Sequence, residues 1–295
     1  MYLIQAVRPL QWVKNGLIFL PFLFAVDLAW SLDDLNRIPE IVARLAIVFG
    51  GFCALSSAVY LLNDILDRHA DRSHPTKRAR PIASGKVSVP VASTWMIFLG
   101  LAGLVITFFI DHLITGIGTL YLIINVAYSL GVKNWVLADV LAVASGYVIR
   151  AAVGAVAIGV VGSPWLYAVT AAGALFIVLG RRYAEVRLAR DDVARQRPVL
   201  RAYAGPLMGQ LLTISATSAL VSYTLYTVEA DNLPANETML LSVPFVVFGV
   251  FRYLYLLNTS PQAESPEHLF SRDAPLLASI ICWVGVSVLV LLLNR

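Results

Sequence analysis

Three aspartates with helical spacing lie between an apolar run and a basic run of the sequence. Asp64 is followed by Asp67 at i+3 and Asp71 at i+7, directly after "LAIVFGGFCALSSAVYLL". If one helix continues through them, the three carboxylates share a face, with Asn63 one turn before Asp67. Carboxylates this close repel one another unless a cation neutralises them, and proteins bind Mg²⁺ through one or two carboxylates together with substrate phosphates. The spacing therefore predicts a magnesium site.

The segment that follows the aspartates is basic. We expect the helix to end by His74-Pro75, because proline disfavours the helical conformation in the residue before it. Lys77, Arg78 and Arg80 come next, in "TKRARP", and suit phosphate binding beside a metal. A plainer explanation is a solvated loop, which accounts for the basic residues equally well. It accounts less well for acidic residues that gather on one face.

The composition shows in which environment this site lies. Of the 295 residues, 59% are hydrophobic and 14% are charged, and the mean hydropathy is +0.77. These values exceed those of an ordinary soluble domain, so the chain is predicted to be a membrane protein. Cys53 and Cys282 are the only cysteines, and each lies in an apolar run. We expect free buried thiols and no disulfide, metal or redox role for them.

Long apolar segments supply the elements that would position the site. A helix that crosses a bilayer needs roughly 20 mostly apolar residues. The sequence offers nine candidates, and we expect a single all-α transmembrane domain over residues 1–295. The candidates lie near residues 15–30, 43–62, 89–110, 112–130, 135–158, 164–180, 207–228, 238–257 and 275–293.

The distribution of lysine and arginine orients this bundle, because these residues accumulate in cytoplasmic loops. With the N-terminus inside, 17 of the 22 basic residues fall on the cytoplasmic side, whereas Arg37, Arg44 and Arg295 fall on the other. The sequence therefore predicts a cytoplasmic N-terminus and a C-terminus outside. It also predicts a basic cytoplasmic surface that attracts anions.

Further polar residues stand near the cytoplasmic ends of other segments. Lys14 and Lys133 lie beside the first and fifth candidates, and we expect both to join the anion site. The competing explanation is a lysine that reaches from the membrane to the interface. Tyr128 has a similar pair of explanations, as a site residue or as an interfacial anchor.

The end of the sixth segment carries Arg181, Arg182 and Tyr183, which we also expect to bind substrate. Glu185 lies one turn after Arg181, so an ion pair that orients the arginine explains it as well as metal binding does.

Two charges lie within the fifth segment, where burial is costly and charged residues are usually functional. Asp139 and Arg150 are eleven residues apart, about 16 Å along a helix, so they do not simply neutralise each other. We expect Asp139 to line a cavity and Arg150 to bond to another helix.

At this point the motifs resemble a known family. "NDILDRHAD" resembles the NDxxDxxxD motif of the UbiA superfamily of intramembrane prenyltransferases, which are nine-helix bundles with a Mg²⁺-diphosphate site. Within it, "NDILDRHADRSHPTKRARPIASG", "RPLQWVKN" and "GRRYAEVRL" resemble the decaprenyl-phosphate phosphoribosyltransferase branch. Ordinary superfamily members carry a second aspartate-rich motif after the sixth span. This chain has Glu185 and Asp191-Asp192 there, which disfavours a plain prenyl-diphosphate mechanism.

The resemblance implies an enzyme of a bacterial cytoplasmic membrane that crosses the bilayer several times. It would move 5-phosphoribose from phosphoribosyl diphosphate to a polyprenyl phosphate and release diphosphate, with no nucleic acid as partner. Asp64, Asp67 and Asp71 would hold Mg²⁺ and stabilise the leaving group. The acceptor is already an anion, so no strong general base is needed. The residues expected to bind substrate are Lys14, Asn63, Lys77, Arg78, Arg80, Tyr128, Lys133, Arg181, Arg182, Tyr183 and Glu185.

Two other functions stay open from the sequence. The first is a UbiA-type prenyltransferase that attaches a prenyl chain to an aromatic or other small acceptor. The second is a transporter with a metal-regulated gate, although the sequence lacks the internal repeat that many transporters show.

Overall fold

The computed structural model describes residues 2–26, 28–31, 34–74, 77–189, 199–203, 205–230, 233–234, 236–260, 263 and 266–293. Within these ranges the secondary structure is helical, apart from one isolated bridge between Val26 and Trp30. The chain falls into two compact units. Unit 1 comprises residues 1–22, 35–142 and 149–161, and unit 2 comprises residues 23–34, 143–148 and 162–295. The single domain over residues 1–295 stays a prediction.

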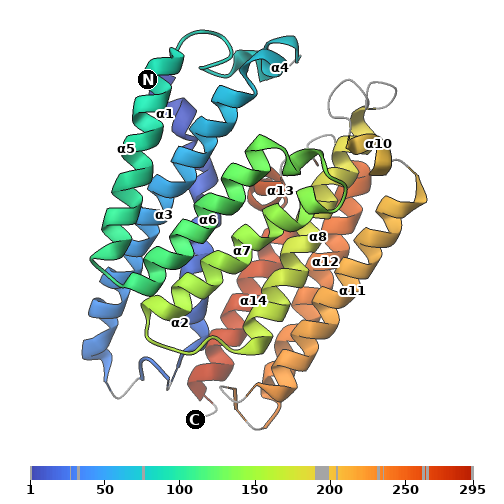
Figure 1. Cartoon of the computed structure of the whole chain (residues 1–295). Coiled ribbons are helices and arrows are strands. Elements are labelled where there is room, and N and C mark those ends of the chain that lie inside the picture. Colours follow the sequence, from blue (N-terminus) through green and yellow to red (C-terminus); the bar gives the residue numbers. More distant parts are fainter. Residues whose placement is uncertain are drawn as a thin grey trace. The chain divides into compact units, whose positions relative to one another are not determined.

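Unit 1 is built on the long helix α3 (Ile38–Leu66), which lies beside α5 (Val89–Phe108) (Figure 1). Its other elements are α1 (Tyr2–Val7), η1 (Pro9–Phe19), η2 (Leu35–Arg37), α4 (Arg68–Ser73), η3 (Lys77–Ala79), α6 (His112–Leu130), η4 (Val132–Asn134) and the two ends of α7 (Ala138–Ala157). Glycines let α3 and α5 approach closely, since a Cβ on Gly103 would lie 2.8 Å from the carbonyl oxygen of Gly51. Ile18, Leu45, Phe52 and Leu55 are fully buried in this unit.

The first predicted span differs from the structure. Residues 15–30 do not form one long helix: the 3₁₀ helix η1 ends at Phe19, and α2 (Leu20–Phe24) adds only five residues. Pro21 supplies a reason, because proline has no N–H to donate along a helix. The backbone of η1 also packs against α7, where a Cβ on Gly154 would collide with the carbonyl of Ile18.

The other eight predicted spans correspond to eight helical segments that are long and apolar enough to cross a membrane, among the residues described. They are Leu35–Leu66, Val89–Phe108, His112–Leu130, Ala138–Ala157, Pro164–Leu188, Pro206–Glu229, Thr238–Thr259 and Ala274–Leu293. Exposed apolar side chains such as Phe98, Ile123 and Ile281 cover these helices, as expected of surfaces that meet lipid. A ninth crossing and the cytoplasmic N-terminus stay predictions.

The two cysteines are free, and only one is buried. Cys53 lies in the interior of unit 1, whereas Cys282 is exposed on the outer surface of a spanning helix. The expectation of a buried Cys282 was wrong because an apolar run in a membrane helix can face lipid instead of protein.

Unit 2 contains four long helices and shorter connecting ones. Helix α8 (Pro164–Ala189) lies beside α11 (Pro206–Glu229), and α12 (Val243–Thr259) packs with α14 (Ala274–Leu293) (Figure 1). The shorter elements are α10 (Leu200–Tyr203), η6 (Thr238–Ser242) and α13 (Pro266–Arg272), and α2 is divided between the units. Gly180 lets α8 approach α12, since a Cβ there would lie 2.9 Å from the side chains of Tyr253 and Leu257.

The acidic motif lies across the junction of α3 and α4. Asp67 interrupts the helix as a turn residue with φ −86° and ψ 1°. The hydrogen bonds nevertheless continue, because Asp67 N donates to Asn63 O at 2.9 Å and Asp71 N donates to Asp67 O at 2.8 Å. Helix α4 ends at Ser73, and His74 has an extended backbone. The predicted helix end is therefore confirmed.

Candidate functional site

Two of the three aspartates share one arginine. Asp64 and Asp71 are 1% and 4% exposed. Arg80 Nη1 lies 3.2 Å from Asp64 Oδ1 and 2.7 Å from Asp71 Oδ2. The loop after α4 therefore brings Arg80 back over the acidic face, as a phosphate-binding loop beside a metal would require. A buried carboxylate needs such partners, because an unpaired charge in the interior is very costly.

The third aspartate has a different cation. Lys133 Nζ, on the short helix η4, lies 2.5 Å from Asp67 Oδ1. The two residues are 66 positions apart in the sequence. The fold thus brings together two predicted site residues that lie far apart in the sequence.

The structure adds a residue that the sequence reasoning did not select for the site. Arg8 Nη2 lies 2.5 Å from Asp64 Oδ1, and its guanidinium stands 5.1 Å from the ring centre of Tyr60. The motif "RPLQWVKN" begins with Arg8. In the sequence alone, Arg8 is only one of the basic residues on the predicted cytoplasmic side.

Two buried oxygens of the motif have no hydrogen-bond partner among the residues that the structure describes. These are Asn63 Oδ1 and Asp64 Oδ2. Amide and carboxylate oxygens are the hard ligands that Mg²⁺ and Ca²⁺ prefer. Among the described residues no three His, Cys, Asp or Glu side chains are grouped closely enough to hold a metal ion by themselves. The residues therefore fit a divalent cation whose remaining ligands are water and substrate phosphate.

The remaining predicted residues of the loop are more peripheral. Lys77 N donates to His74 Nδ1 at 3.4 Å, and Arg78 is exposed on η3. Burial lowers the pKa of His74, and the positive charges of Lys77 and Arg80 lower it further, against an opposing effect of Asp71. The structure thus places Arg80 on the carboxylates, whereas Arg78 faces outwards.

Lys14 and Tyr128 lie on η1 and α6. Lys14 Nζ donates to Gln11 Oε1 at 2.6 Å within η1. Tyr128 is half-buried on α6, in the turns before Lys133. Their roles as substrate ligands stay predictions.

Arg150 forms a buried polar centre in unit 1. Its Nε donates to Asn15 Oδ1 at 2.7 Å, and its Nη2 donates to Tyr121 Oη at 3.2 Å. Asn15 Nδ2 in turn donates to Cys53 Sγ at 3.2 Å. The predicted inter-helix role of Arg150 is confirmed. Asp139 is fully buried, and its role in lining a cavity stays a prediction.

In unit 2 the predicted residues form an ion-pair cluster on α8. Glu185 receives Arg181 Nε at 3.2 Å on Oε1 and Arg182 Nη1 at 2.6 Å on Oε2. Both carboxylate oxygens are therefore engaged, so the ion pair, one of the two explanations for Glu185, is present, and its role in substrate binding stays a prediction. Arg182 is 4% exposed. Asp191 and Asp192 lie outside the described residues.

Tyr183 and an additional arginine tie α8 to the end of α12. Tyr183 Oη donates to Asn258 Oδ1 at 2.5 Å. Arg187 donates to the carbonyls of Asn258 at 2.7 Å and Ser260 at 2.6 Å. Tyr183 thus has a structural partner in this conformation.

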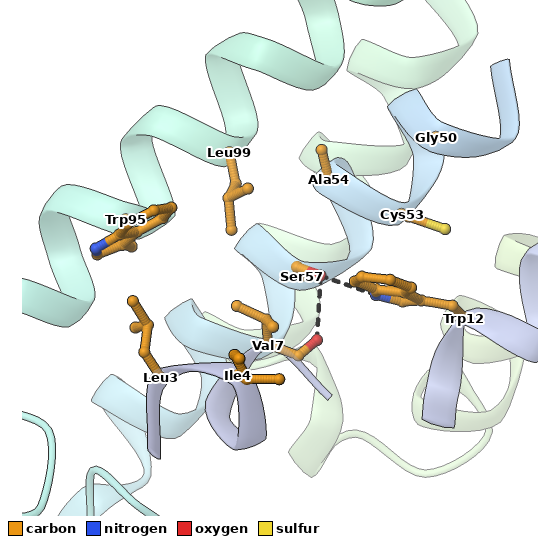
Figure 2. A pocket seen from close by; sticks show the side chains of 10 residues that line it. All are labelled: Leu3, Ile4, Val7, Trp12, Gly50, Cys53, Ala54, Ser57, Trp95 and Leu99. Atoms are coloured by element: carbon orange, nitrogen blue, oxygen red, sulfur yellow. Dashed lines mark hydrogen bonds between the residues drawn. The ribbon is translucent and has the colours of Figure 1, made fainter. Parts of the chain in front are cut away.

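Each unit also contains an apolar pocket. The pocket in unit 1 has a volume of about 310 Å³ and lies among α1, α3 and α5, where Trp12, Ser57 and Val7 are linked by hydrogen bonds (Figure 2). The pocket in unit 2, of about 250 Å³, is lined by α8, α11, α12 and α14, with Phe176 and Tyr253 among its residues. Mostly apolar side chains line both pockets.

Comparison with known proteins agrees with the fold and the motif. The UbiA prenyltransferase family matches residues 17–293. Decaprenyl-phosphate phosphoribosyltransferase from Mycolicibacterium smegmatis is 34% identical over 294 residues, which cover 96% of this chain and 90% of that protein. The protein of the same name from Corynebacterium glutamicum is 34% identical, with 96% and 84% covered.

Solved structures agree with the fold at lower identity. A UbiA homolog from Archaeoglobus fulgidus, solved with DMAPP and Mg²⁺, has a TM-score of 0.72 at 16% identity, with 99% of each chain covered. Its structure with GPP and Mg²⁺ has a TM-score of 0.73, also at 16% identity and with 99% of each chain covered. The chain belongs to the UbiA prenyltransferase family.

Proposed function

We propose that the protein transfers 5-phosphoribose from phosphoribosyl diphosphate to a polyprenyl phosphate at the membrane, as the names of its relatives indicate for them. The products are a polyprenyl phosphoribosyl phosphate and diphosphate. The acceptor phosphate oxygen forms a bond to C1 of the ribose while the bond from C1 to the diphosphate breaks.

The charge balance of unit 1 carries this proposal. Asp64, Asp67 and Asp71 are matched by Arg8, Arg80 and Lys133 in direct ion pairs. A bound divalent cation would make this balanced cluster positive, and the loop from Arg68 to Lys86 is basic as well. Such a site requires a ligand with several negative charges, and phosphoribosyl diphosphate has a diphosphate and a separate 5-phosphate.

Asn63 and Asp64 are the residues best suited to hold the cation. Their free buried oxygens give two ligands, and Asp71 and Asp67 become available when Arg80 and Lys133 turn to phosphate oxygens. Mg²⁺ at this position would neutralise charge that develops on the diphosphate leaving group.

The protein's own cations account for the rest of the chemistry. Arginine can bind a phosphate through two parallel hydrogen bonds, whereas lysine provides a point charge. Arg80 would grip the diphosphate, and Lys77 and Arg78 would lie along the same loop. No general base is needed, because the acceptor phosphate is anionic. Catalysis then consists of positioning and charge neutralisation.

Helix α8 carries two further arginines that can bind phosphate. Arg181 and Arg182 share Glu185, which holds them in place without cancelling both charges. We assign Arg182 to the 5-phosphate of the donor. Binding of the lipid phosphate is the competing role.

A prenyltransferase that uses a prenyl diphosphate and a small acceptor is the second candidate. It is favoured by the fold, which the chain shares with a homolog solved with DMAPP and Mg²⁺. It is disfavoured by the sequence after the sixth span, where ordinary family members carry a second aspartate-rich motif and this chain has Glu185 and Asp191-Asp192.

A direct comparison of substrates tests the proposal. Purified protein in lipid nanodiscs is incubated with Mg²⁺ and either phosphoribosyl diphosphate plus polyprenyl phosphate or geranyl diphosphate plus an aromatic acid. Mass spectrometry of the lipid fraction and diphosphate release should show a phosphoribosylated lipid in the first mixture alone. Prenylation of the acid without any consumption of phosphoribosyl diphosphate would establish the second candidate instead.

A further inference from the structure

Arg8 has a backbone conformation that its sequence disfavours. Its φ of 54° and ψ of 63° are left-handed, a region that residues other than glycine seldom adopt. A residue before proline normally has an extended backbone, and Pro9 follows Arg8. Such a conformation persists only where the surroundings hold it, and it frequently marks a functional position.

Helix α3 provides that support. Ser57 Oγ donates to the carbonyl of Val7 at 3.1 Å and accepts from Trp12 Nε1 at 3.0 Å (Figure 2). The chain is thus tied to α3 on both sides of Arg8. Ser57 is 1% exposed, so these bonds are shielded from water.

With its backbone fixed in this conformation, Arg8 contacts Asp64 of the acidic motif through its side chain. Its Nη2 lies 2.5 Å from Asp64 Oδ1. The Asp64 side chain is 2% exposed, whereas that of Arg8 is 27% exposed. One partner is therefore fixed in the interior while the other still reaches solvent.

Arg8 is also the cation that Asp64 can release more readily. Arg80 contacts Asp64 at 3.2 Å and has a second carboxylate, Asp71, at 2.7 Å. If a divalent cation took Asp64 before the donor binds, Arg80 would still have Asp71 as its partner. Arg8 would be left beside a like charge, and its side chain is already 27% exposed.

We propose that Arg8 is the resident counter-ion of the donor site. Without donor it neutralises Asp64, and when a divalent cation takes that carboxylate, Arg8 transfers to a phosphate oxygen of the donor. The inference rests on the proposed function for the identity of the donor, and its cation-binding half is independent of it.

The proposal makes opposite predictions for cation and donor in one variant. In Arg8→Gln, Mn²⁺ alone should bind about tenfold more tightly, because a competing charge has been removed from Asp64. Phosphoribosyl diphosphate with saturating Mn²⁺ should bind at least about tenfold more weakly, because one charge-assisted contact is lost. Electron paramagnetic resonance measures the free Mn²⁺, and calorimetry without lipid acceptor measures donor binding.

Two further variants separate this role from a structural one. Arg8→Lys keeps the charge, so Mn²⁺ affinity should stay within about twofold of wild type while donor binding still weakens. Arg37→Gln removes an exposed arginine on η2, and it should leave both affinities within about twofold, as expected of an exposed charge. If Arg8→Gln does not fold, Arg8→Lys still decides the outcome through its selective loss of donor.

Weaker binding of both Mn²⁺ and donor in Arg8→Gln would overturn the counter-ion role and show that Arg8 only supports the fold. Unchanged affinities for both would overturn it as well. If the wild-type protein binds Mn²⁺ but not phosphoribosyl diphosphate, the proposed function fails, while the Mn²⁺ affinity of Arg8→Gln still supports or overturns the counter-ion role.

Discussion

Replacement of Asp64 should be the most damaging single change in the acidic motif. The side chain is 2% exposed, its Oδ1 receives two arginines, and its Oδ2 has no hydrogen bond from any described residue. Asp64→Asn keeps the shape and removes the charge. The variant then lacks both the attraction for Arg8 and Arg80 and the anionic ligand for the metal.

The expected loss follows from the number of contacts involved. One preorganised electrostatic contact to developing charge contributes about 2.7–4 kcal/mol, or about 100- to 1,000-fold in rate. Asp64→Asn should therefore lower kcat at least ~100-fold. Asp67 has one cation partner and a side chain that is 24% exposed. Asp67→Asn should consequently be the milder variant, with its loss nearer the lower end of this range.

Initial rates of diphosphate release at increasing Mg²⁺ concentration provide the assay. Asp111→Asn is the matched control, because Asp111 caps α6 by accepting from Leu113 N at 2.7 Å and asparagine caps equally well. Its rate should equal that of wild type. Full turnover by Asp64→Asn in EDTA would refute both the metal assignment and the charge argument.

Other variants test donor binding, stability and topology. Alanine at Arg80 or Arg182 should raise the KM for phosphoribosyl diphosphate at least about tenfold, because a bidentate phosphate contact is lost. The KM for polyprenyl phosphate should rise far less. The reverse selectivity in steady-state kinetics would assign these arginines to the lipid phosphate. The pKa of Asp273 is lowered chiefly by its hydrogen bond from an arginine on α12, so the ionised carboxylate stabilises the fold above about pH 4 and loses this effect as the pH falls through the lowered pKa. Thermal unfolding in detergent should accordingly show Asp273→Asn less stable than wild type at pH 7, with the gap closing as the pH falls below about 4. A gap independent of pH would contradict the charge effect. Single cysteines at Arg78 and Asn236, in a background without native cysteine, should be labelled from the cytoplasmic and the external side respectively, and external labelling at Arg78 would overturn the predicted orientation.

Hydropathy was sufficient to predict most of the helices. Eight of the nine predicted segments correspond to apolar helices of spanning length in the described chain, because length and composition decide whether a helix can cross a bilayer. The first segment was apolar enough but formed η1 and the short α2. Its conformation depends on Pro21 and on the packing of Ile18 against Gly154, and hydropathy records neither effect.

The part of the candidate site that lies within one segment of the sequence was predictable. The spacing of Asp64, Asp67 and Asp71 indicated a helical acidic face, and the hydrogen bonds from Asn63 to Asp71 confirm that the helical register continues. The ion pairs between Arg8 and Asp64 and between Lys133 and Asp67 join residues 56 and 66 positions apart. Such pairs depend on which helices become neighbours, and no periodicity in one segment contains that information.

The distribution of partners around Asp64 argues that its remaining ligand comes from outside the chain. A buried carboxylate is tolerated when cations and hydrogen bonds replace its water. Here both arginines approach Oδ1, while Oδ2 and the neighbouring Asn63 Oδ1 are buried without a partner. A purely structural ion pair would gain stability by sharing donors between both oxygens, since an unsatisfied buried acceptor costs about 1–3 kcal/mol. The unshared arrangement leaves two buried hard oxygens without a partner among the described residues, and a divalent cation bound there would satisfy them.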